Sequence, residues 1–524
     1  MSAKKISRRD IFRAGGLSAA AGVLGARTVA SAAAATPAAT NRVANIYTRI
    51  GVRPFINCTA TYTINGGTLT LPEVKEAMDE ASRYSVNIDE LMEKVGERLA
   101  QLLQCEFAIV TAGAAAALTH ATSAAVAGAD PERMKQLPDL TGLKNEVIMP
   151  KQSRNVYDHA IRTTGVKMIE IDARDEFYAA LGKRTALVAV LGTGEAAGKI
   201  RLEEMAEAAH KLGVPVLVDG AAELPTPPNP YLRRGADLVA YSGGKIIRGP
   251  QCSGLLLGRK DLVKAAWINS APHHAFGRAL KVGKEEIMGL LAAIEYFVGK
   301  RDIQAEYREW EGWWAHIATV ITRLGGIETR VNPPAGASPF PVLNVQWDPQ
   351  KYHLTAGETY DLLLNGEPRI MSHAAGDGHS FIIRPAAMQA GDEKLVAARL
   401  EEIFQQATGP RKPREPRPPA TQITGRWDAD VQFASGSSRH TLFLEQDGNK
   451  VSGTHQGRTL KGDLAGAIDG DQVRLRSGFR YEGASLSYTF VCKVAGDGVE
   501  GEVDLDEYGK ARFTARRHRY GERA

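Results

Sequence analysis

The sequence predicts an α/β protein in which a large, mostly parallel domain is followed by a small α+β subdomain and a separate all-β domain. Between about residues 45 and 405, short aliphatic runs alternate with amphipathic segments, which is the pattern of a parallel sheet covered by helices. After residue 423, short alternating runs are separated by Gly-containing turns, as in a small barrel or sandwich. A proline-rich stretch lies between the two patterns, so we expect it to link two domains.

The large domain, residues 45–340, alternates predicted strands with predicted helices. Its strands are Phe107–Thr111, Glu146–Met149, Met168–Ile171, Leu187–Leu191, Val216–Val218, Leu238–Tyr241 and Gly254–Leu257. Its helices include Ala114–Val126, Leu202–Leu212 and Glu285–Val298. The second of these helices reads LEEMAEAAHKL, with apolar residues at i, i+3, i+4 and i+7, the spacing of one helix face. We therefore expect one large α/β domain.

Residues 341–408 change character and are predicted to form the small α+β subdomain. Short strands are expected at Val342–Gln346 and Phe381–Arg384, and a closing helix in EKLVAARLEEIFQQA. Residues 409–422, within TGPRKPREPRPPATQ, carry a proline every two or three positions, which favours an extended polyproline-type linker. We expect the arginines of this linker to be solvated.

The all-β domain, residues 423–524, contains runs such as HTLFLEQ and LSYTFVCKV, with Asp-Gly or Gly-Asp turns near residues 447, 470 and 497. No cluster of histidine, cysteine and carboxylate residues in it has the pattern of a catalytic site. We therefore expect an accessory module that binds a ligand or stabilises the rest of the chain.

The N-terminal segment, residues 1–36, has the features of a signal peptide for export. A basic start, an apolar alanine-rich centre and a small-residue A-x-A ending near Ala32 follow one another. Arg8 and Arg9 resemble the pair in twin-arginine signals, although Ile11 replaces the usual phenylalanine, and an ordinary secretory signal is the alternative. No other apolar run reaches the roughly 18 residues of a membrane span. We expect a soluble protein in the periplasm or otherwise outside the cytoplasm.

Charge argues against a nucleic-acid partner, and cysteine spacing argues against a cysteine-based metal or redox site. The formal charge of +5 is small for 524 residues and is spread along the chain, which argues against a nucleic-acid partner. The four cysteines are widely spaced and form no CxxC pair, so neither a zinc site nor a redox dithiol is indicated. A disulfide is permitted outside the cytoplasm but is not implied.

Three separate features point to one chemistry. Lys245 lies in YSGGKIIRGPQCSG, just after two glycines and a serine; by itself it would be a solvated turn lysine. TAGAAAAL, at Thr111–Leu118, ends a strand and starts an alanine-rich helix, whose free N–H groups suit either a phosphate or close helix packing. Asp219 ends the strand in VPVLVDGAAELP, where it faces a ligand crevice or caps a helix.

Together, a lysine, a strand-end carboxylate and a bare helix start meet the requirements of pyridoxal phosphate. The lysine binds the aldehyde, the carboxylate keeps the pyridine nitrogen protonated, and the helix start binds the phosphate. Ser242, three residues before Lys245, is placed to add a hydroxyl to the phosphate site. We expect Gly243 and Gly244 to leave clearance for the cofactor.

A dinucleotide site is the main competing interpretation. The segment ALVAVLGTGEAAGKIRLEEMAEAAHKLGVPVLVD runs from a strand through Gly192-x-Gly194-x-x-x-Gly198 and a helix to a second strand and Asp219, much like an NAD-binding unit. Against it, the helical pattern starts only at Leu202 and not at the glycines. This interpretation also leaves the lysine without a role.

Five segments, in the same order, resemble the selenocysteine-synthase-like branch of fold-type-I pyridoxal phosphate enzymes, which includes the D-glucosaminate-6-phosphate ammonia-lyases. They are INCTATYTINGGTLTLPEVKEAM, TAGAAAALTHATSAAVAG, LVDGAAELP, YSGGKIIRGPQCSGLLLGRKDLV and GRALKVGKEEIMGLLAAIEYF. The resemblance covers about residues 45–405, and it implies the fold-type-I large domain and small subdomain.

The resemblance also implies a role for each matching residue. It makes Lys245 the lysine bound to the cofactor and Asp219 the partner of the pyridine nitrogen. The phosphate site then consists of Ala112, Gly113, Ala114 and Ser242. The family's GRxxKxxKE segment, here with Arg278, carries basic residues near the active site at a subunit boundary. A homodimer or higher homo-oligomer follows from this resemblance.

One departure concerns the residue that stacks on the pyridine ring. In MPKQSRNVYDHAIR, relatives often have a histidine at the position of Ser153. Its replacement by serine leaves Asn155 and Tyr157 as the alternatives for stacking and indicates altered control of the reaction.

The residues predict a pyridoxal-phosphate-dependent lyase or transferase acting on a small-molecule amino substrate. The Lys245 amine can take the proton of the substrate α-carbon, and a leaving group on the β-carbon is then eliminated. We expect an ammonia-lyase or dehydratase acting on a small amino acid or amino-sugar acid. A substrate carboxylate needs an arginine, and the candidates are Arg384, Arg369 and Arg278.

Other activities use the same residues and stay open as alternatives. These are an aminotransferase, an aldolase, a racemase and a selenium-transferase-like transferase. Transfer to aminoacyl-tRNA does not suit an exported enzyme. A non-catalytic binding protein, in which the all-β domain does the binding, is a further alternative, but the intact Lys245 and Asp219 argue against it.

Overall fold

The computed structural model describes residues 45–519 except residues 337, 374–377 and 412–414. The predicted signal peptide, residues 1–36, lies outside the described residues. The described residues form two units, 45–54 and 55–519. The first contains only a short 3-10 helix, η1 (Thr48–Ile50), and the second contains every α-helix and strand of the described chain.

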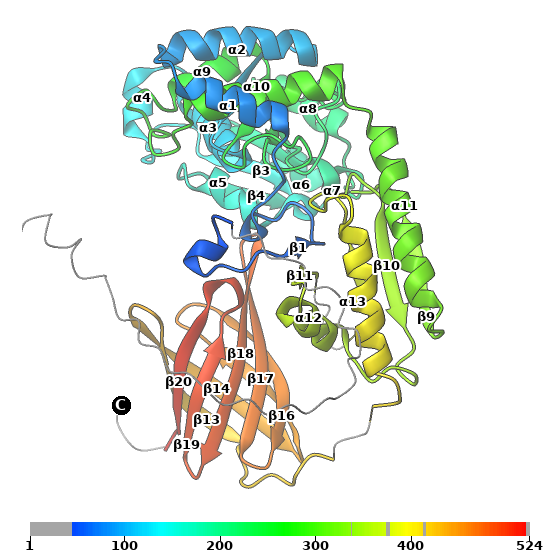
Figure 1. The fold of residues 1–524 in the computed structure, drawn as a ribbon. Coiled ribbons are helices and arrows are strands. Elements are labelled where there is room, and N and C mark those ends of the chain that lie inside the picture. Colours follow the sequence, from blue (N-terminus) through cyan, green and yellow to red (C-terminus); the bar gives the residue numbers. More distant parts are fainter. Residues whose placement is uncertain (1–44, 337, 374–377, 412–414, 520–524) are drawn as a thin grey trace, which may run out of the picture. The chain divides into compact units, whose positions relative to one another are not determined.

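A seven-stranded sheet forms the centre of the large domain (Figure 1). Its order is β2-β8-β7-β6-β5-β3-β4, and every neighbouring pair is parallel except the two pairs that β8 makes. The strands are β2 (Phe107–Thr111), β3 (Glu146–Pro150), β4 (Lys167–Ile171), β5 (Thr185–Leu191), β6 (Val216–Asp219), β7 (Leu238–Ser242) and β8 (Gly254–Gly258). The predicted mostly parallel sheet is thus confirmed, and each strand agrees with its predicted range within two residues at either end.

The central strands are uninterrupted apolar runs because helices cover both faces of a parallel sheet. All residues of β6 and β8 are buried, whereas most residues of the edge strand β4 are at least partly exposed. In β6, Asp219 pairs with Leu191 on one side and Ala240 on the other. The carboxyl ends of β5, β6 and β7 therefore meet at one edge, where open α/β sheets bind ligands.

Ten helices surround this sheet in the described large domain. They are α1 (Pro72–Ser82), α2 (Ile88–Leu103), α3 (Ala114–Ala127), α4 (Pro131–Gln136), α5 (His159–Arg162), α6 (Arg174–Ala180), α7 (Gly192–Glu195), α8 (Leu202–His210), α9 (Lys260–Ile268) and α10 (Lys284–Gly299). The predicted helices correspond to α3, α8 and α10. Helix α3 is nearly all small residues because it is buried between α9 and the strands β7 and β8.

The small subdomain packs helices on a three-stranded antiparallel sheet of order β12-β10-β9. Its elements are α11 (Ile303–Thr322), β9 (Ile327–Asn332), β10 (Val342–Trp347), α12 (Ala356–Asn365), β11 (Ile370–Met371), β12 (Ser380–Ile383) and α13 (Asp392–Gln406). Its core includes Trp314 and Ile327, so the subdomain begins before residue 341, the boundary that the sequence suggested. The reason is that α11 packs against both α13 and β9.

The last domain is a closed barrel of eight antiparallel strands, one of the two architectures that the sequence allowed. Its strands are β13 (Gly425–Gln432), β14 (Ser437–Asp447), β15 (Lys450–Gln456), β16 (Lys461–Asp469), β17 (Gln472–Tyr481), β18 (Ala484–Ala495), β19 (Gly498–Asp504) and β20 (Lys510–Arg517). Each strand pairs with the next, and β20 pairs with β13. Inward residues such as Trp427, Phe490 and Phe513 fill the interior. The linker is partly tied down, because Arg411 pairs with Glu358 and Arg417 with Asp469.

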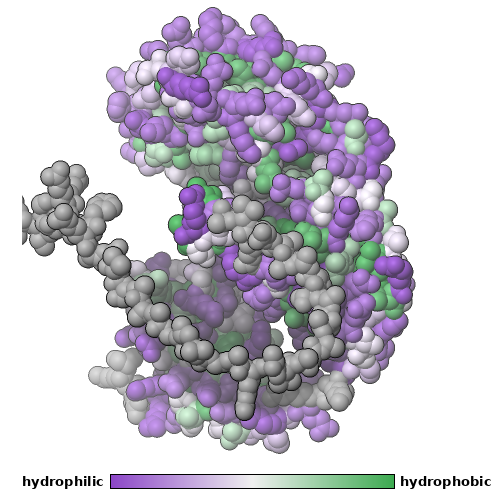
Figure 2. Space-filling model, viewed as in Figure 1, coloured by the Kyte–Doolittle hydropathy of each residue, from purple (hydrophilic) through white to green (hydrophobic). Residues whose placement is uncertain are grey.

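On the face shown in Figure 2, hydrophilic side chains dominate and hydrophobic ones occur in small groups. Among the helices of the described residues, none combines the length and the apolar composition needed to cross a bilayer.

Candidate active site

Lys245 lies in the turn that follows β7 and is half-buried. Its Nζ atom is 5.5 Å from the centroid of the Tyr157 ring, and the amine makes no hydrogen bond or ion pair with the described residues. Burial lowers the pKa of Lys245, and the nearby carboxylate of Asp219 opposes this shift in part. A lysine amine that loses its proton more readily is a better nucleophile and a better base near neutral pH.

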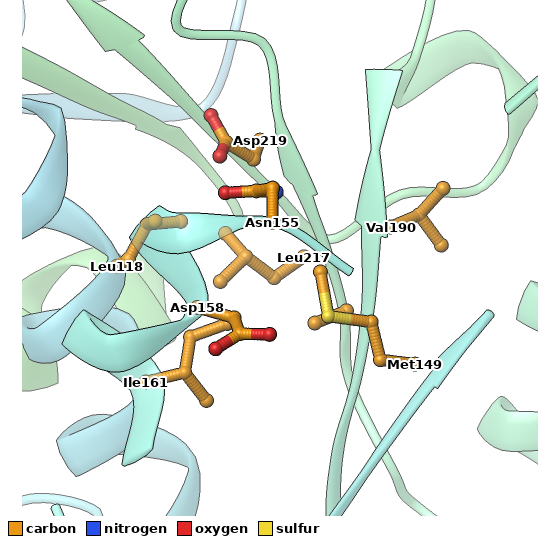
Figure 3. A pocket seen from close by; sticks show the side chains of 9 residues that line it. Leu118, Met149, Asn155, Asp158, Ile161, Val190, Leu217 and Asp219 are labelled. Carbon is orange, nitrogen blue, oxygen red and sulfur yellow. The ribbon is translucent and has the colours of Figure 1, made fainter. Parts of the chain in front are cut away.

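Asp219 ends β6 and is only 7% exposed. Its Oδ1 atom accepts a hydrogen bond from the backbone N–H of Ala221 at 3.0 Å, and its other oxygen has no partner in the described chain. Burial raises the pKa of Asp219, while the Ala221 N–H and the charge of Lys245 lower it. Figure 3 shows the cause: Asp219 and Asn155 lie beside the apolar side chains of Leu118, Met149, Val190 and Leu217. A cationic group beside Asp219 would favour the charged carboxylate and so lower its pKa again.

An open pocket of about 300 Å³ contains both residues. Its walls come from five parts of the chain: the segment after β1 (Ile56–Asn57), the segment after β3, the ends of β5 and β6, the turn after β7, and the small subdomain. The lining residues include Ala60, Thr61, Tyr62, Thr63, Asn155, Tyr157, Thr193, Ala221, Ser338, Phe340 and Arg384. This volume suits a small molecule.

The start of α3 offers an anion site close to β7 and β8. Gly113 precedes the helix with φ of 93°, and no side chain of the described residues caps the first turn, so its N–H groups are free for another acceptor. A Cβ atom on Gly254 would lie 2.3 Å from the Gly113 carbonyl carbon and 2.7 Å from the Ala114 nitrogen. Ser242 pairs with Gly254 in the sheet, so its position is next to the start of α3. Ala112, half-buried, completes this loop.

These features fit pyridoxal phosphate. The pocket provides an amine with no partner among the described residues and a buried carboxylate with an unused oxygen. Next to it in the sequence of sheet strands, but outside the lining of this pocket, the start of α3 packs against Gly254, a residue that has no Cβ atom. Lys245 would hold the aldehyde, Asp219 the pyridine nitrogen, and the α3 start with Ser242 the phosphate. The pattern that suggested NAD does not fit, because a Cβ atom on Gly192 would be 2.2 Å from the Glu223 carboxylate, which would repel a pyrophosphate.

Of the three candidate arginines, the structure brings only Arg384 to the pocket. Its Nη1 atom is buried and has no hydrogen-bond partner among the described residues. Arg369 instead donates to the Leu364 carbonyl at 3.0 Å and lies 5.8 Å from the Phe55 ring centroid. Arg278 is exposed and does not line the pocket of this chain. Of the three arginines, Arg384 is therefore the one that presents an N–H group to the pocket.

The structure separates Ser153 from the pocket. Its side chain is fully buried with no hydrogen-bond partner in the described chain, and it does not line the Lys245 pocket. Asn155 and Tyr157, the two alternatives, both line it, and only Tyr157 presents an aromatic ring beside Lys245. Burial is the main cause that raises the pKa of the Tyr157 hydroxyl.

The sequence interpretation missed the wall formed by residues 60–63. Ala60 has φ of 70°, which is unusual for a residue other than glycine, and it lines the pocket. The Tyr62 ring meets His373 edge-on at 5.0 Å between centroids. The sequence feature that could have indicated this wall is the run of small and polar residues in INCTATYTINGG. This run is part of the family resemblance, but the resemblance assigned it no role.

The two glycines before Lys245 serve a different purpose from the one expected. A Cβ atom on Gly243 would lie 2.1 Å from the Ser253 hydroxyl, and one on Gly244 would lie 2.5 Å from the Gln251 side chain. They therefore give clearance to the returning chain of the same turn, which holds the lysine backbone in place.

Known proteins resemble most of this chain. An aminotransferase class-V family model matches residues 73–275. The chain is 28% identical to the D-glucosaminate-6-phosphate ammonia lyase of Salmonella typhimurium (strain 14028s / SGSC 2262) over 69% of this chain and 99% of that protein. It is 30% identical to the 5'-C-glycyluridine monooxygenase-decarboxylase of Streptomyces sp over 68% of this chain and 92% of that protein.

A solved structure agrees with these matches. The structure of D-glucosaminate-6-phosphate ammonia-lyase aligns with a TM-score of 0.62 and 27% identity, covering 70% of this chain and 99% of that one. About a third of this chain thus has no counterpart in that structure.

Proposed function

Because the chain belongs to the aminotransferase class-V family of pyridoxal phosphate enzymes, we propose that it is a lyase acting on a small amino acid or amino-sugar acid. One observation carries the proposal. A single pocket holds a lysine, a buried carboxylate and an arginine, and in the described part of the chain neither the lysine amine nor the buried Nη1 of the arginine has a partner. The first two residues serve the cofactor, and the third is left for the substrate.

Lys245 is the residue that holds and moves the proton. The bound cofactor supplies an electron sink for the charge left on the substrate α-carbon when its proton is removed. Burial lowers the pKa of Lys245, so a larger fraction of the amine is neutral and can accept that proton near neutral pH. With a leaving group on the β-carbon, loss of the proton leads to elimination.

Arg384 orients the substrate in this proposal. A guanidinium with an unused N–H group in a pocket makes a charge-assisted hydrogen bond with a carboxylate. Burial lowers the pKa of His373, with a further lowering by Arg384, so this histidine stays neutral beside the guanidinium and does not compete for an anion. Ala60 and Phe340 add apolar surface to the wall, against which the uncharged part of the substrate packs.

The test begins with the cofactor and ends with the products. The purified protein should be yellow, and borohydride should remove the absorbance band of the lysine-bound cofactor. Candidate amino acids and amino-sugar acids are then screened for release of ammonia and a 2-oxo acid without an added amino acceptor. A protein that cannot be loaded with pyridoxal phosphate would refute the proposal.

A second candidate function comes from the 30% identical relative named as a monooxygenase-decarboxylase. In that case the same pocket would remove carbon dioxide from an amino substrate with consumption of oxygen. An oxygen electrode and detection of carbon dioxide separate the two, because elimination consumes no oxygen. An aminotransferase is identified by its need for a 2-oxo acid acceptor.

We also propose a homo-oligomer. The support is the family's basic segment: Arg278 and Lys281 are exposed in the single chain and do not line its pocket. Light scattering after gel filtration measures the mass. Arg278→Glu with Lys281→Glu should shift it toward the mass of the monomer, which is 56.5 kDa for the full 524-residue chain, and an unchanged mass would contradict the role of this segment.

Export by the twin-arginine route is a third proposal, supported by the sequence of residues 1–36 alone. Replacing Arg8 and Arg9 by lysine should retain the protein in the cytoplasm, as measured by cell fractionation. Export of the variant at the original level would instead indicate an ordinary secretory signal.

A further inference from the structure

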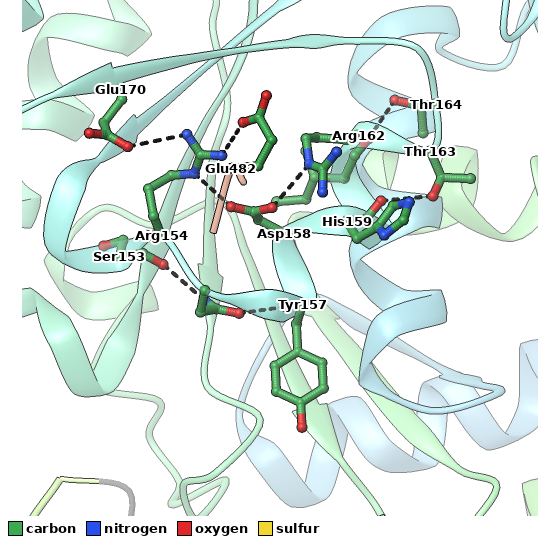
Figure 4. Close-up of polar contacts among 12 residues, drawn as sticks. Ser153, Arg154, Tyr157, Asp158, His159, Arg162, Thr163, Thr164, Glu170 and Glu482 are labelled. Atoms are coloured by element: carbon green, nitrogen blue, oxygen red, sulfur yellow. Dashed lines mark hydrogen bonds and ion pairs between the residues drawn. The ribbon is translucent and has the colours of Figure 1, made fainter. Parts of the chain in front are cut away.

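The barrel contacts the part of the large domain that lines the Lys245 pocket (Figure 4). We call residues 153–158, which follow β3, the active-site segment. On one side, its Asn155 and Tyr157 line the pocket. On the other, its Arg154 and Asp158 lie against the turn between β17 and β18, where Glu482 and Gly483 are the two turn residues.

Arg154 is the centre of this contact. Its side chain is only 4% exposed, and its guanidinium donates to Asp158 at 2.6 Å, to Glu170 at 3.3 Å and to Glu482. Asp158, with a fully buried side chain, also accepts from Arg162 at 3.1 Å. Arg480 of β17 lies 4.0 Å from Glu170. Three basic and three acidic side chains thus balance one another, and removal of one acid leaves a buried guanidinium short of a partner.

The turn has the geometry of a docking element. Glu482 has φ of 53°, a left-handed conformation that favours glycine or asparagine in a two-residue hairpin turn. A Cβ atom on Gly483 would lie 2.2 Å from the Asn155 carbonyl oxygen and 2.5 Å from an Asp158 carboxylate oxygen. The residue that fits the left-handed turn poorly supplies the ion pair, and the residue without a side chain allows the close approach. The contact with the active-site segment explains why Glu and Gly occupy these two turn positions, whereas the geometry of the barrel turn alone does not.

The contact between the barrel turn and the active-site segment affects the pocket through the backbone of that segment. The Asn155 side chain accepts a hydrogen bond from the Tyr157 N–H at 2.8 Å and donates one to the Ser153 carbonyl at 2.9 Å. In Figure 4 the Tyr157 ring points away from the ion pairs. A shift of the backbone at Asn155, where Gly483 packs, therefore changes the direction of the ring that lies beside Lys245.

We propose that the barrel is a clamp on the active-site segment, and that Glu482 and Gly483 are positioning residues for Asn155 and Tyr157. The clamp rests on the proposed function only in that the segment faces the cofactor pocket. It gives the third domain a role in the chemistry of the first without a ligand of its own.

Two variants of the full-length protein test the clamp from different directions. Glu482→Gly removes the carboxylate but suits the left-handed turn, so the barrel should fold. Gly483→Ala keeps every charge and adds only a methyl group. Hydrogen exchange is measured on the cofactor-free proteins, and both variants should exchange faster in residues 153–158 with unchanged protection of the barrel strands. Glu445→Gln, which removes an exposed carboxylate from β14, is the control.

The second readout is cofactor affinity, measured by absorbance titration. Both variants should bind pyridoxal phosphate about tenfold more weakly: Glu482→Gly because it leaves a buried guanidinium short of a partner, and Gly483→Ala because the added methyl group displaces the backbone at Asn155. Glu482→Asp should recover part of the loss of Glu482→Gly. Unchanged exchange and affinity in both variants would overturn the clamp. A loss in Gly483→Ala alone would refute the role of the Glu482 charge. If the wild type binds no cofactor, the proposed function fails, but the exchange of residues 153–158 still decides the clamp.

Discussion

The Nζ atom of Lys245 lies 5.5 Å from the centroid of the Tyr157 ring, within the range of a cation–π contact. The two residues come from the turn after β7 and from the segment after β3. Tyr157 therefore presents an aromatic face beside the amine that would hold the cofactor, the role for which Ser153 carries no ring. Of the two stacking alternatives, Tyr157 is the one that brings an aromatic ring to Lys245, and we predict that it stacks on the cofactor.

Tyr157→Ala should weaken cofactor binding by about tenfold, because an aromatic contact contributes about 0.5 to 1.5 kcal/mol beyond the area that it buries. Tyr157→Phe keeps the ring and should bind as the wild type does. Absorbance titration of the cofactor measures both. Asn155→Ala, with its ring partner intact, is the comparison. A Tyr157→Ala variant that binds the cofactor as tightly as the wild type does would refute the stacking role of the ring.

Lys245→Ala should abolish the borohydride-sensitive absorbance band and lower turnover by roughly 10² to 10⁴ or more, the range for removal of a positioned base. The control is Lys183→Ala, which removes an exposed lysine and should leave both properties unchanged. Added methylamine should restore part of the activity of Lys245→Ala if the amine acts as the base. Normal colour and turnover in Lys245→Ala would move the cofactor to another lysine.

Asp219→Asn should stabilise the cofactor-free protein at neutral pH. Burial holds the folded-state pKa of Asp219 above 3.8, its ordinary value, so the free energy of unfolding of the wild type falls as the pH rises through the folded-state pKa. The variant lacks this loss. Its Tm should therefore exceed that of the wild type above this pH window and match it at lower pH, where the carboxyl is protonated in both states.

The same variant should lose the advantage when the cofactor is present, because only a carboxylate pairs with a protonated ring nitrogen. Thermal unfolding with and without pyridoxal phosphate, at several pH values, measures both effects. A Tm difference that is independent of pH would show that the Asp219 carboxyl has the same pKa in the folded and unfolded states.

The sheet and the meeting of Asp219 with Lys245 could be predicted from the sequence. Strands β6 and β7 are mostly apolar runs, and their polar residues lie at the carboxyl ends. A carboxylate that ends such a run in a parallel sheet lies at the ligand-binding edge. The start of α3 as an anion site could also be predicted, because small residues and a glycine provide no side chain to cap its first turn. Local pattern and sheet topology were sufficient for these features.

The choice of Tyr157 and the wall at Ala60 could not be predicted in this way. Tyr157 is directed by a segment whose Arg154 pairs with Glu482, a residue 328 positions away in another domain. The Ala60 wall depends on the pairing of Ile56 with Ile370, which brings the start of the chain to the small subdomain. No local periodicity encodes contacts over such separations.

Arg384→Gln should raise the KM of a carboxylate substrate by ten- to a hundredfold, because a charge-assisted hydrogen bond contributes about 1.5 to 3 kcal/mol. Arg384→Lys keeps the charge and should lose less. The matched control is Arg369→Lys, an arginine of the same subdomain outside the pocket. Equal effects in the Arg384 and Arg369 variants would indicate a packing role for both. Before the substrate is known, binding of small amino acids to the loaded enzyme can be followed by the cofactor spectrum.

Gly254→Ala should impair phosphate binding without changing any charge. The new Cβ atom would lie 2.3 Å from the Gly113 carbonyl carbon and 2.7 Å from the Ala114 nitrogen, and both are backbone atoms that cannot rotate away. The start of α3 must therefore shift, and its N–H groups no longer converge on the phosphate. We expect pyridoxal phosphate to bind at least about tenfold more weakly, since an overpacked contact typically costs 1 to 3 kcal/mol.

Pyridoxal, which lacks the phosphate, provides the decisive comparison for this variant. Its affinity depends on Lys245 and Asp219 but not on the start of α3, so it should change little, and the preference for the phosphorylated form should fall. Gly312→Ala, in a helix where a Cβ atom would meet nothing within 4 Å, is the control for adding a methyl group. Equal losses for pyridoxal and pyridoxal phosphate would mean that Gly254→Ala disturbs the whole pocket, and the α3 start would then lose its assignment as the phosphate site.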